Sequence, residues 1–243
     1  MPRAHIVEIL GLIADGRDHD ASLPSRLCQE ALVSLTVSGV GMALMTAEGQ
    51  NGGVVAATDG TARQMEDLQF SLGEGPCVDA SHSGRPVLQP DLLATALARW
   101  PAFGGAVLAA GVRAIFAFPL QVGAIRLGVL DLYRSTAGPL SDLDLADALA
   151  FADAATLVLL RLQDRFGGED DAGPTDAVDD RAEVHQATGM ISIQLGVSLA
   201  VALARLRAHG YAESRPVSDI AADVVRRRVR FDDTASGTSR ERV

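Results

Sequence analysis

The sequence predicts an α+β protein in which an antiparallel sheet flanked by helices is followed by a small three-helix bundle. Two stretches, 112–120 and 126–133, have the apolar composition of strands and are joined by a turn with Gly123, which is typical of an antiparallel hairpin. A long helical pattern covers 141–165, and a second, purely helical pattern covers 181–230. In the first part the helices can bury their apolar faces against the sheet, and in the second part the helices can bury theirs against one another.

Length and charge divide the chain in the same way. Its 243 residues fit two small domains better than one. The net charge of −10 is uneven, with −13 over residues 1–180, +4 over 181–230 and −1 over the rest. The basic part holds eight arginines against four acids. Positive charge confined to one small module indicates an output domain that binds a polyanion.

The N-terminus and the cysteines favour the cytoplasm. Residues 1–19 are expected to be an N-terminal arm, whose apolar run is interrupted by Glu8 and Gly11, unlike a secretory signal. No apolar run approaches the length of about 18 residues that a membrane span needs. Cys28 and Cys77 form neither a disulfide framework nor a cysteine-rich zinc site.

The first domain, residues 20–165, mixes helical and strand patterns. Ser141 is a natural N-cap for the long helix, and Pro101 breaks the helical pattern before it. The long helix is apolar on more than one side, so it needs two partners, the sheet and the same helix of a second subunit. We therefore expect a homodimer.

The elements before the hairpin are a helix at 24–37, strands at 40–46 and 53–58, a helix at 61–70, a strand at 85–89 and a broken helix at 92–110.

A linker and a bundle complete the chain. Residues 166–180 hold three glycines, one proline and six acids, which cannot build a core. The bundle at 181–231 should contain a helix over about 177–194, a second that Ser198 caps and Gly210 ends, and a third that begins at Pro216. Residues 232–243 read as a polar tail.

Residues 181–231 resemble the ANTAR output domain, a three-helix RNA-binding module of bacterial antitermination regulators. The matching residues are Arg181, Val184, Ala187, Gly189 and Met190, then Leu203, Leu206 and Arg207, then Arg215, Val217, Asp219, Ile220, Ala221, Val224 and Val225. Residues 20–165 resemble a GAF sensor domain through GEGPC at 73–77, GRPV at 84–87, FPL at 118–120 and LGVLDLY at 127–133.

Together the two halves resemble an actinobacterial GAF–ANTAR regulator. The resemblance implies a signal-sensing, GAF-like antiparallel sheet and an ANTAR dimer. That dimer would bind paired hairpin loops in nascent RNA, so that a terminator cannot form. Three positions depart from the ANTAR pattern, which usually has a basic residue at Thr188, an acid at Val201 and a small helix former at Gly210.

The expected RNA-binding residues are Arg181, His185, Thr188, Arg207, Tyr211 and Arg215. The resemblance favours Arg181 and Arg215, and arginine can stack on an unpaired base or bind a phosphate with two hydrogen bonds. His185 and Tyr211 can stack on bases. The alternatives are a helix-surface residue for His185 and a core residue for Tyr211.

Cys77 and His82 are the candidate sensor-pocket or redox residues. Cys77 lies in a Gly- and Pro-rich turn that should be partly exposed, where it is either a reactive thiol or chromophore anchor or a small apolar residue that locks a loop. A metal pair with His82 would need further ligands, so no metal site is expected. Asp131 fits the polar face of a strand. No catalytic constellation and no cofactor are predicted, although a GAF-like domain can hold a small-molecule ligand of unknown identity.

Two other functions remain open at this point. Some GAF domains reduce free methionine sulfoxide through a cysteine relay, which needs thiols in one cleft. A DNA-binding regulator would need a recognition helix that reads bases from its N-terminal end, whereas Arg226, Arg227 and Arg228 lie at the end of the third helix.

Overall fold

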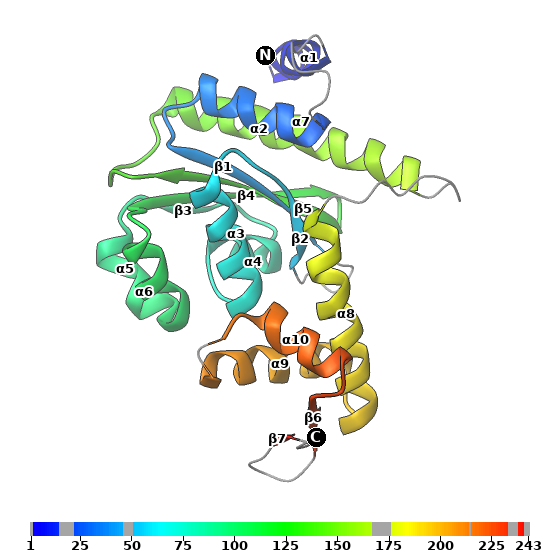
Figure 1. The fold of residues 1–243 in the computed structure, drawn as a ribbon. Coiled ribbons are helices and arrows are strands. Elements are labelled where there is room, and N and C mark those ends of the chain that lie inside the picture. Colours follow the sequence, from blue (N-terminus) through cyan, green and yellow to red (C-terminus); the bar gives the residue numbers. More distant parts are fainter. Residues whose placement is uncertain are drawn as a thin grey trace. The chain divides into compact units, whose positions relative to one another are not determined.

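The structure is a computed structural model, and it contains two compact units (Figure 1). The units are Met1–Phe70 with Glu74–Ala172, and Ser71–Gly73 with Gly173–Val243. The backbone is described for residues 2–14, 22–45, 51–166, 176–213, 215–232 and 238–240, and the side chains for 6–13, 22–45, 53–162, 183–213 and 215–232.

The first unit is built on a five-stranded antiparallel sheet in the order β2-β1-β5-β4-β3. The predicted hairpin is confirmed, with β4 and β5 joined at Gly123, whose φ of +60° suits glycine. The strands are β1 (Gly39–Met45), β2 (Asn51–Ala57), β3 (Val87–Gln89), β4 (Ala114–Val122) and β5 (Ile125–Arg134).

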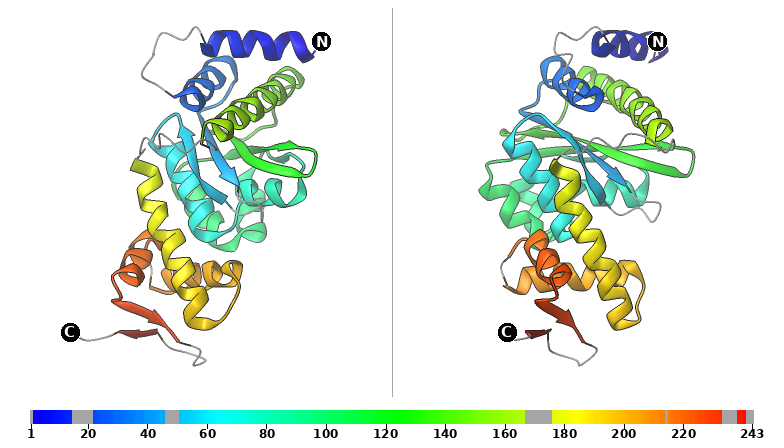
Figure 2. Two further views of the ribbon diagram at one scale, coloured as in Figure 1. Left: turned by 90° about the vertical axis from the view of Figure 1, so that its right-hand side faces the viewer. Right: turned by 45° about the vertical axis from the view of Figure 1, so that its right-hand side comes forward.

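Helices cover both faces of this sheet (Figures 1 and 2). One face carries α2 (Leu23–Ser34) and α7 (Asp142–Phe166). The other carries α3 (Gly60–Leu72) and α4 (Pro76–Ser83), with α5 (Leu92–Arg99) and α6 (Pro101–Ala109) on the same side. The break before Pro101 and the Ser141 cap are as predicted, since the Asp144 amide donates to Ser141 Oγ at 3.0 Å.

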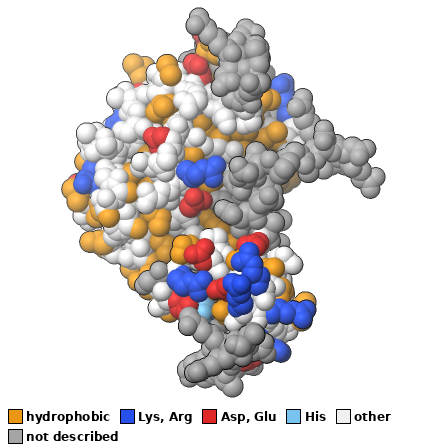
Figure 3. Space-filling model, viewed as in Figure 1, with side chains coloured by type: hydrophobic (Ala, Val, Ile, Leu, Met, Phe, Trp, Pro, Cys, Tyr) orange, Lys and Arg blue, Asp and Glu red, His pale blue; other side chains and the backbone are white. Residues whose placement is uncertain are grey.

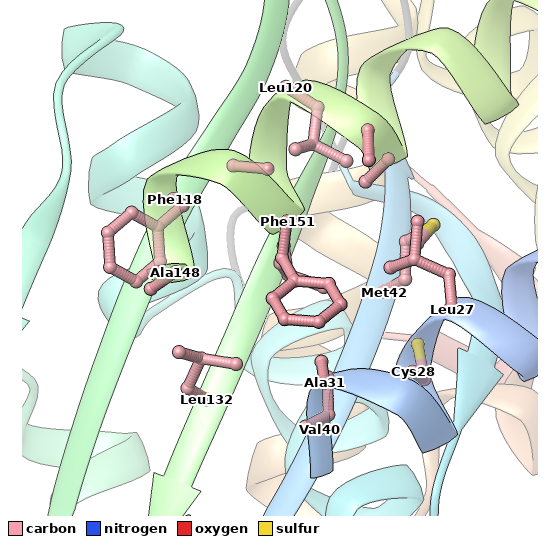
Figure 4. Close-up of a cluster of buried hydrophobic side chains, with 14 of the residues drawn as sticks. Leu27, Cys28, Ala31, Val40, Met42, Phe118, Leu120, Leu132, Ala148 and Phe151 are labelled. Carbon is pink, nitrogen blue, oxygen red and sulfur yellow. The ribbon is translucent and has the colours of Figure 1, made fainter. Parts of the chain in front are cut away.

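The main core lies between the sheet and the α2–α7 layer. Strand alternation turns Leu132 toward α7, where it lies near Phe151 and Phe118 (Figure 4). Asp131 and Tyr133, the neighbours of Leu132 in β5, therefore point to the opposite face of the sheet, which α3 and α4 cover. The apolar core thus covers one face of the sheet, and the face toward α3 and α4 carries buried polar groups.

The N-terminal arm expected for residues 1–19 is instead a helix, α1 (Pro2–Ala14), as far as these residues are described. Its apolar residues recur every three to four positions, so Ile9 and Ile13 are buried in the main core. Because α1 and α2 both contact α7, they cover part of the apolar surface that the sequence assigns to a second subunit. Leu143, Leu149 and Leu157 of α7 remain exposed.

The second unit contains α8 (Asp176–Leu195), α9 (Leu199–Glu213) and α10 (Val217–Val225), which pack on one another. Within it, β6 (Val229–Phe231) pairs with β7 (Thr238–Arg240), which the sequence reads as part of the tail. Of the expected linker, residues 167–175 lie outside the described part and 176–180 belong to α8.

Two predicted helix ends are wrong. Gly210 does not end the second helix, because α9 continues to Glu213 and Gly210 packs closely on the backbone carbonyl of Arg215. The third helix ends at Val225, so Arg226–Arg228 form a turn rather than a helical face.

Among the described helices, none alone is long and apolar enough to span a membrane. Only Glu183–Leu195 with Leu199–Glu213, bent by 107°, meet that test as a pair.

Candidate functional site

A buried polar cluster lies on the sheet face that α3 and α4 cover. It consists of Glu66 and Gln69 from α3, Cys77 from α4, and Asp131 and Tyr133 from β5. Tyr133 is 2% exposed and the other four side chains are 0% exposed. Full burial of two carboxyl groups is costly, so this cluster needs an explanation.

Small residues make room for the cluster. Asp131 lies between Gly41 on β1 and Ala117 on β4 in the sheet register. A Cβ atom at Gly41 would overlap the Glu66 carboxyl group, so glycine is needed for this close approach. The carboxyl group of Glu66 thus occupies space that a longer strand residue would fill.

Gln69 holds the cluster together with both ends of its amide. Its Nε2 donates to Asp131 Oδ2 at 3.0 Å, and its Oε1 accepts from the Cys77 backbone amide at 2.8 Å. The Tyr133 hydroxyl donates to Glu66 Oε1 at 2.6 Å. These bonds join α3, α4 and β5 in one network.

The two carboxyl groups interact with each other. Asp131 has hydrogen bonds with Gln69, Glu66, Cys77 and Tyr133, which oppose the effect of burial, but burial is the larger effect and raises the pKa of Asp131 to about 6. The contribution of Glu66 lowers the pKa of Asp131, but it is smaller than the effect of burial.

The Cys77 thiol is held in its protonated form. Burial raises its pKa well above the usual value, and the carboxyl groups of Asp131 and Glu66 raise it further. Burial and the same two acids also raise the pKa of the Tyr133 hydroxyl. A thiol in these surroundings is a poor nucleophile, because only the thiolate attacks.

The sequence predicts that Cys77 is partly exposed, and this prediction is wrong. GEGPC does not form an exposed turn, because Pro76 begins α4 and Cys77 lies buried in the first turn of that helix. His82, in the last turn of α4, is exposed and does not belong to the cluster. Cys28 lies on α2, so the two cysteines come from helices on opposite faces of the sheet.

The predicted RNA-binding residues of the second unit lie on α8, on α9 and in the segment just before α10. Arg215, just before α10, donates to Asp223 at 2.8 Å and to Glu213 at 3.4 Å. Arg228 approaches the same Asp223 carboxylate at 3.6 Å. Arg215 and Arg228 therefore contact the same carboxylate, although Arg228 was not among the predicted RNA-binding residues.

The other predicted residues separate into different environments. His185 on α8 is exposed, which fits its helix-surface alternative, and Tyr211 on α9 is 67% exposed, so the alternative of a core residue is wrong. Thr188 is 6% exposed and its hydroxyl donates to the Val184 carbonyl, which removes it from the candidate RNA surface. Arg207 lies on α9. Arg181 lies on α8, but its side chain is outside the described residues.

The turn after α10 carries the residues that sequence reasoning misplaced. The Arg228 amide donates to the Asp223 carbonyl at 2.7 Å and the Arg227 amide to the Val224 carbonyl at 2.9 Å, the pattern of a Schellman motif. Arginines and acids alternate on the surface of this unit (Figure 3). A groove of about 400 Å³ lies beside the turn, lined by Met190, Ile193, Gln194, Arg227, Val229 and Arg230.

Sequence reasoning also missed Glu66 and Gln69. Nothing marks them in a helix of ordinary polarity. Asp131, which stands between leucines in LGVLDLY, was expected on the polar face of a strand, but that face is covered and the side chain is buried. The cluster depends on how α3 packs on β5, which no local pattern encodes.

Comparisons with known proteins agree with this fold. A family model described as GAF domain matches residues 23–160. The GAF domain of a phosphoenolpyruvate-protein phosphotransferase from Coxiella burnetii is 12% identical with a TM-score of 0.51, covering 69% of this chain and 97% of that chain. The GAF domain of the Acinetobacter phosphoenolpyruvate-protein phosphotransferase is 12% identical with a TM-score of 0.50, covering 69% and 98%.

A type II free methionine-R-sulfoxide reductase from Thermoplasma acidophilum is similar at 17% identity and a TM-score of 0.43, covering 56% of this chain and 89% of that chain. No curated protein sequence matches. The match to the family model covers more than half of the chain, and the five-stranded antiparallel sheet with helices on both faces fits it. The chain therefore belongs to the GAF domain family.

Proposed function

We propose that this protein is a signal-responsive transcription antitermination regulator. Its GAF domain is the sensor, and its second unit is an ANTAR-like module that binds hairpin-loop RNA as a dimer. The observation that carries the proposal is the arginine-rich turn at the end of α10. That turn presents positive charge from one small helical unit of an otherwise acidic chain.

The arginines of this turn are available to an anion. The side chains of Arg226 and Arg228 are 53% and 69% exposed, and their ion pairs with Glu183 and Asp223 are long, at 3.5 and 3.6 Å. Exposed ion pairs contribute only about 0–1 kcal/mol, so RNA phosphates can replace the acidic partners. Release of counterions from the RNA would then favour binding.

Arg215 has a different role in this proposal. Its 2.8 Å bond to Asp223 is the shorter of the two contacts to that carboxylate, and it ties the segment before α10 to the helix itself. We assign Arg215 a smaller share of the RNA contact than Arg226 and Arg228, although the ANTAR resemblance favours Arg215.

The groove beside the turn supports recognition of unpaired bases. Met190 and Ile193 give it an apolar surface, while Arg227 and Arg230 give it positive charge. Single-stranded loops are bound by proteins that stack splayed bases and contact the neighbouring phosphates. A duplex cannot present a base in this way, so the groove favours a loop over a helix of RNA or DNA.

The proposed dimer uses α7. Leu143, Leu149 and Leu157 are 79%, 44% and 42% exposed, and helical spacing places them on one sector of the helix. An exposed apolar stripe of this kind is typical of a surface that a second subunit covers. Two copies of the small reader would then face two loops at once.

Binding of full-length protein to a pool of RNA hairpins with randomised loops tests the proposal. Fluorescence anisotropy should show tighter binding to this pool than to matched DNA hairpins or duplex DNA. Arg228→Ala should weaken binding and flatten the slope of log K against log salt by about 0.7, the value for one single-strand phosphate contact. Arg85→Ala, which removes an exposed arginine from the GAF domain, is the matched control and should change neither quantity.

Two outcomes would replace the proposal. Tighter binding to duplex DNA would favour a DNA-binding regulator, and equal binding by all probes would leave only general electrostatic attraction. The thiol reductase alternative gains no support from Cys77, because that thiol is buried and protonated.

A further inference from the structure

Three potential metal ligands converge in the buried cluster of the GAF domain. A carboxylate oxygen of Glu66, the Cys77 sulfur and a carboxylate oxygen of Asp131 all lie within 4.8 Å of one another. They come from α3, α4 and β5, and all three side chains are 0% exposed. Separate elements thus direct one sulfur and two oxygens to a common point.

Asp131 supplies a second, independent observation. Its Oδ1 is buried and accepts no hydrogen bond, while its Oδ2 accepts from Gln69. None of the groups that shift the pKa of Asp131 is a cation. A buried acceptor left without a partner keeps its full desolvation penalty, and a bound cation would remove that penalty.

We propose that Glu66, Cys77 and Asp131 bind one divalent transition-metal ion, with Zn²⁺ the best-suited ion. Zinc binds thiolate sulfur at about 2.3 Å and carboxylate oxygen at about 2.0–2.2 Å. In a tetrahedral site such ligands are roughly 3.3–3.8 Å apart, so ligand atoms within 4.8 Å of one another need to approach by about 1.5 Å or less. The thiolate excludes Mg²⁺ and Ca²⁺, which prefer oxygen ligands only.

Neighbouring groups already orient the ligands. The Tyr133 hydroxyl donates to Glu66 Oε1, and the Gln69 amide donates to Asp131 Oδ2. Hydrogen bonds of this kind hold metal-binding carboxylates in a fixed rotamer and raise affinity. Gly41 keeps the space for the Glu66 carboxyl group open.

Metal binding needs the thiolate and both carboxylates, so any protons that these three groups hold leave to solvent as the ion enters. The three ionised ligands together with one M²⁺ carry a total charge of −1. This site belongs to the GAF domain and does not depend on the proposed RNA-binding role.

Cobalt is the probe that tests this site, because a cysteine thiolate bound to Co²⁺ gives a sulfur-to-metal charge-transfer band in the near ultraviolet. Tag-free full-length protein, treated with a chelator and reductant, should develop this band with one equivalent of Co²⁺ and lose it on addition of Zn²⁺. The chain has two cysteines, so Cys28→Ser is the matched control for Cys77→Ser. We expect the band to remain in Cys28→Ser and to disappear in Cys77→Ser.

Two near-isosteric variants keep the test valid if Cys77→Ser does not fold. Glu66→Gln and Asp131→Asn retain both thiols, and each should weaken Co²⁺ binding at least tenfold. Fluorescence of Trp100, which is buried in the GAF domain, reports whether each variant is folded. A wild-type protein without the band at millimolar Co²⁺, a band that survives in Cys77→Ser, or unchanged affinity in both acid variants would overturn the proposal.

Discussion

Replacing Arg227 should separate the stability of the second unit from its binding of RNA. In the part of the chain that the structure describes, Arg227 is the one non-glycine residue with positive φ, at +60°. It occupies the position of a Schellman motif where glycine is usual, directly after the helix cap at Arg226. An arginine at this position is costly for folding, which suggests that its side chain serves another purpose.

The magnitude follows from two opposing terms. The left-handed conformation costs a residue with a Cβ atom about 1–2 kcal/mol, which Arg227→Gly removes. Glycine loses more backbone entropy on folding, about 0.5–1 kcal/mol. The net gain in stability for Arg227→Gly is therefore about 0–1.5 kcal/mol, with a central value of about 0.75 kcal/mol. For a unit of this size the central value raises the midpoint of thermal unfolding by roughly 3–6 °C.

Calorimetry of the full-length chain and hydrogen exchange of α8 and α10 amides measure this effect, and anisotropy measures RNA affinity. Arg227→Gly should stabilise the second unit and weaken RNA binding. Arg227→Ala keeps the backbone cost and loses only the guanidinium, so it should weaken binding without the gain in stability. If Arg227→Gly is no more stable than Arg227→Ala, the strain argument is wrong, and if both bind RNA as tightly as wild type, Arg227 is not part of the reader.

Three further substitutions test other parts of the account. Gly41→Ala should destabilise the GAF domain by about 1–3 kcal/mol, because the added Cβ atom overlaps a buried carboxyl group. Gly105→Ala, at an open helical position, should instead stabilise the domain by about 0.5–1 kcal/mol. Denaturant titrations followed by tryptophan fluorescence measure both changes. The hydrogen bond from Arg215 lowers the pKa of Asp223 in the folded protein. The pair therefore stabilises the second unit fully at pH values above about 3.9, the pKa of aspartate in unfolded chains. This stability is lost as the pH falls through the lower folded-state pKa of Asp223. Asp223→Asn should remove that loss from acid unfolding curves, and an unchanged curve would exclude the pair as its source. Leu157→Gln on the exposed side of α7 should shift a dimer toward monomer in sedimentation velocity, and a monomeric wild type would contradict the proposed dimer.

Local patterns predicted much of the GAF fold. The hairpin could be read from two apolar strands around Gly123, and the interrupted helix from Pro101, because each depends on residues that are neighbours in sequence. Residues 1–19 were harder to assign, since the burial of Ile9 depends on α2 and α7, which lie far along the chain.

The candidate sites were less accessible to sequence reasoning. The buried cluster requires α3 to lie over β5 and Gly41 to lie beside Asp131, and neither relation leaves a periodic signal. The run of Arg226–Arg228 continues a helical pattern, and only the hydrogen bonds after Val224 show that the chain turns there. Polar residues buried by tertiary contacts and arginine in a left-handed turn both contradict the local rules on which such reasoning depends.

The central claim is that the second unit, and not the GAF domain, contacts hairpin-loop RNA. The most direct measurement is photocrosslinking of the full-length chain to a hairpin that carries 4-thiouridine in its loop, followed by mass spectrometry of the crosslinked peptides. The account predicts crosslinks within residues 183–230, concentrated around the turn at Arg226–Arg228 and the groove at Met190 and Ile193. Crosslinks confined to residues 23–160, or an equal yield from a fully paired RNA, would contradict it.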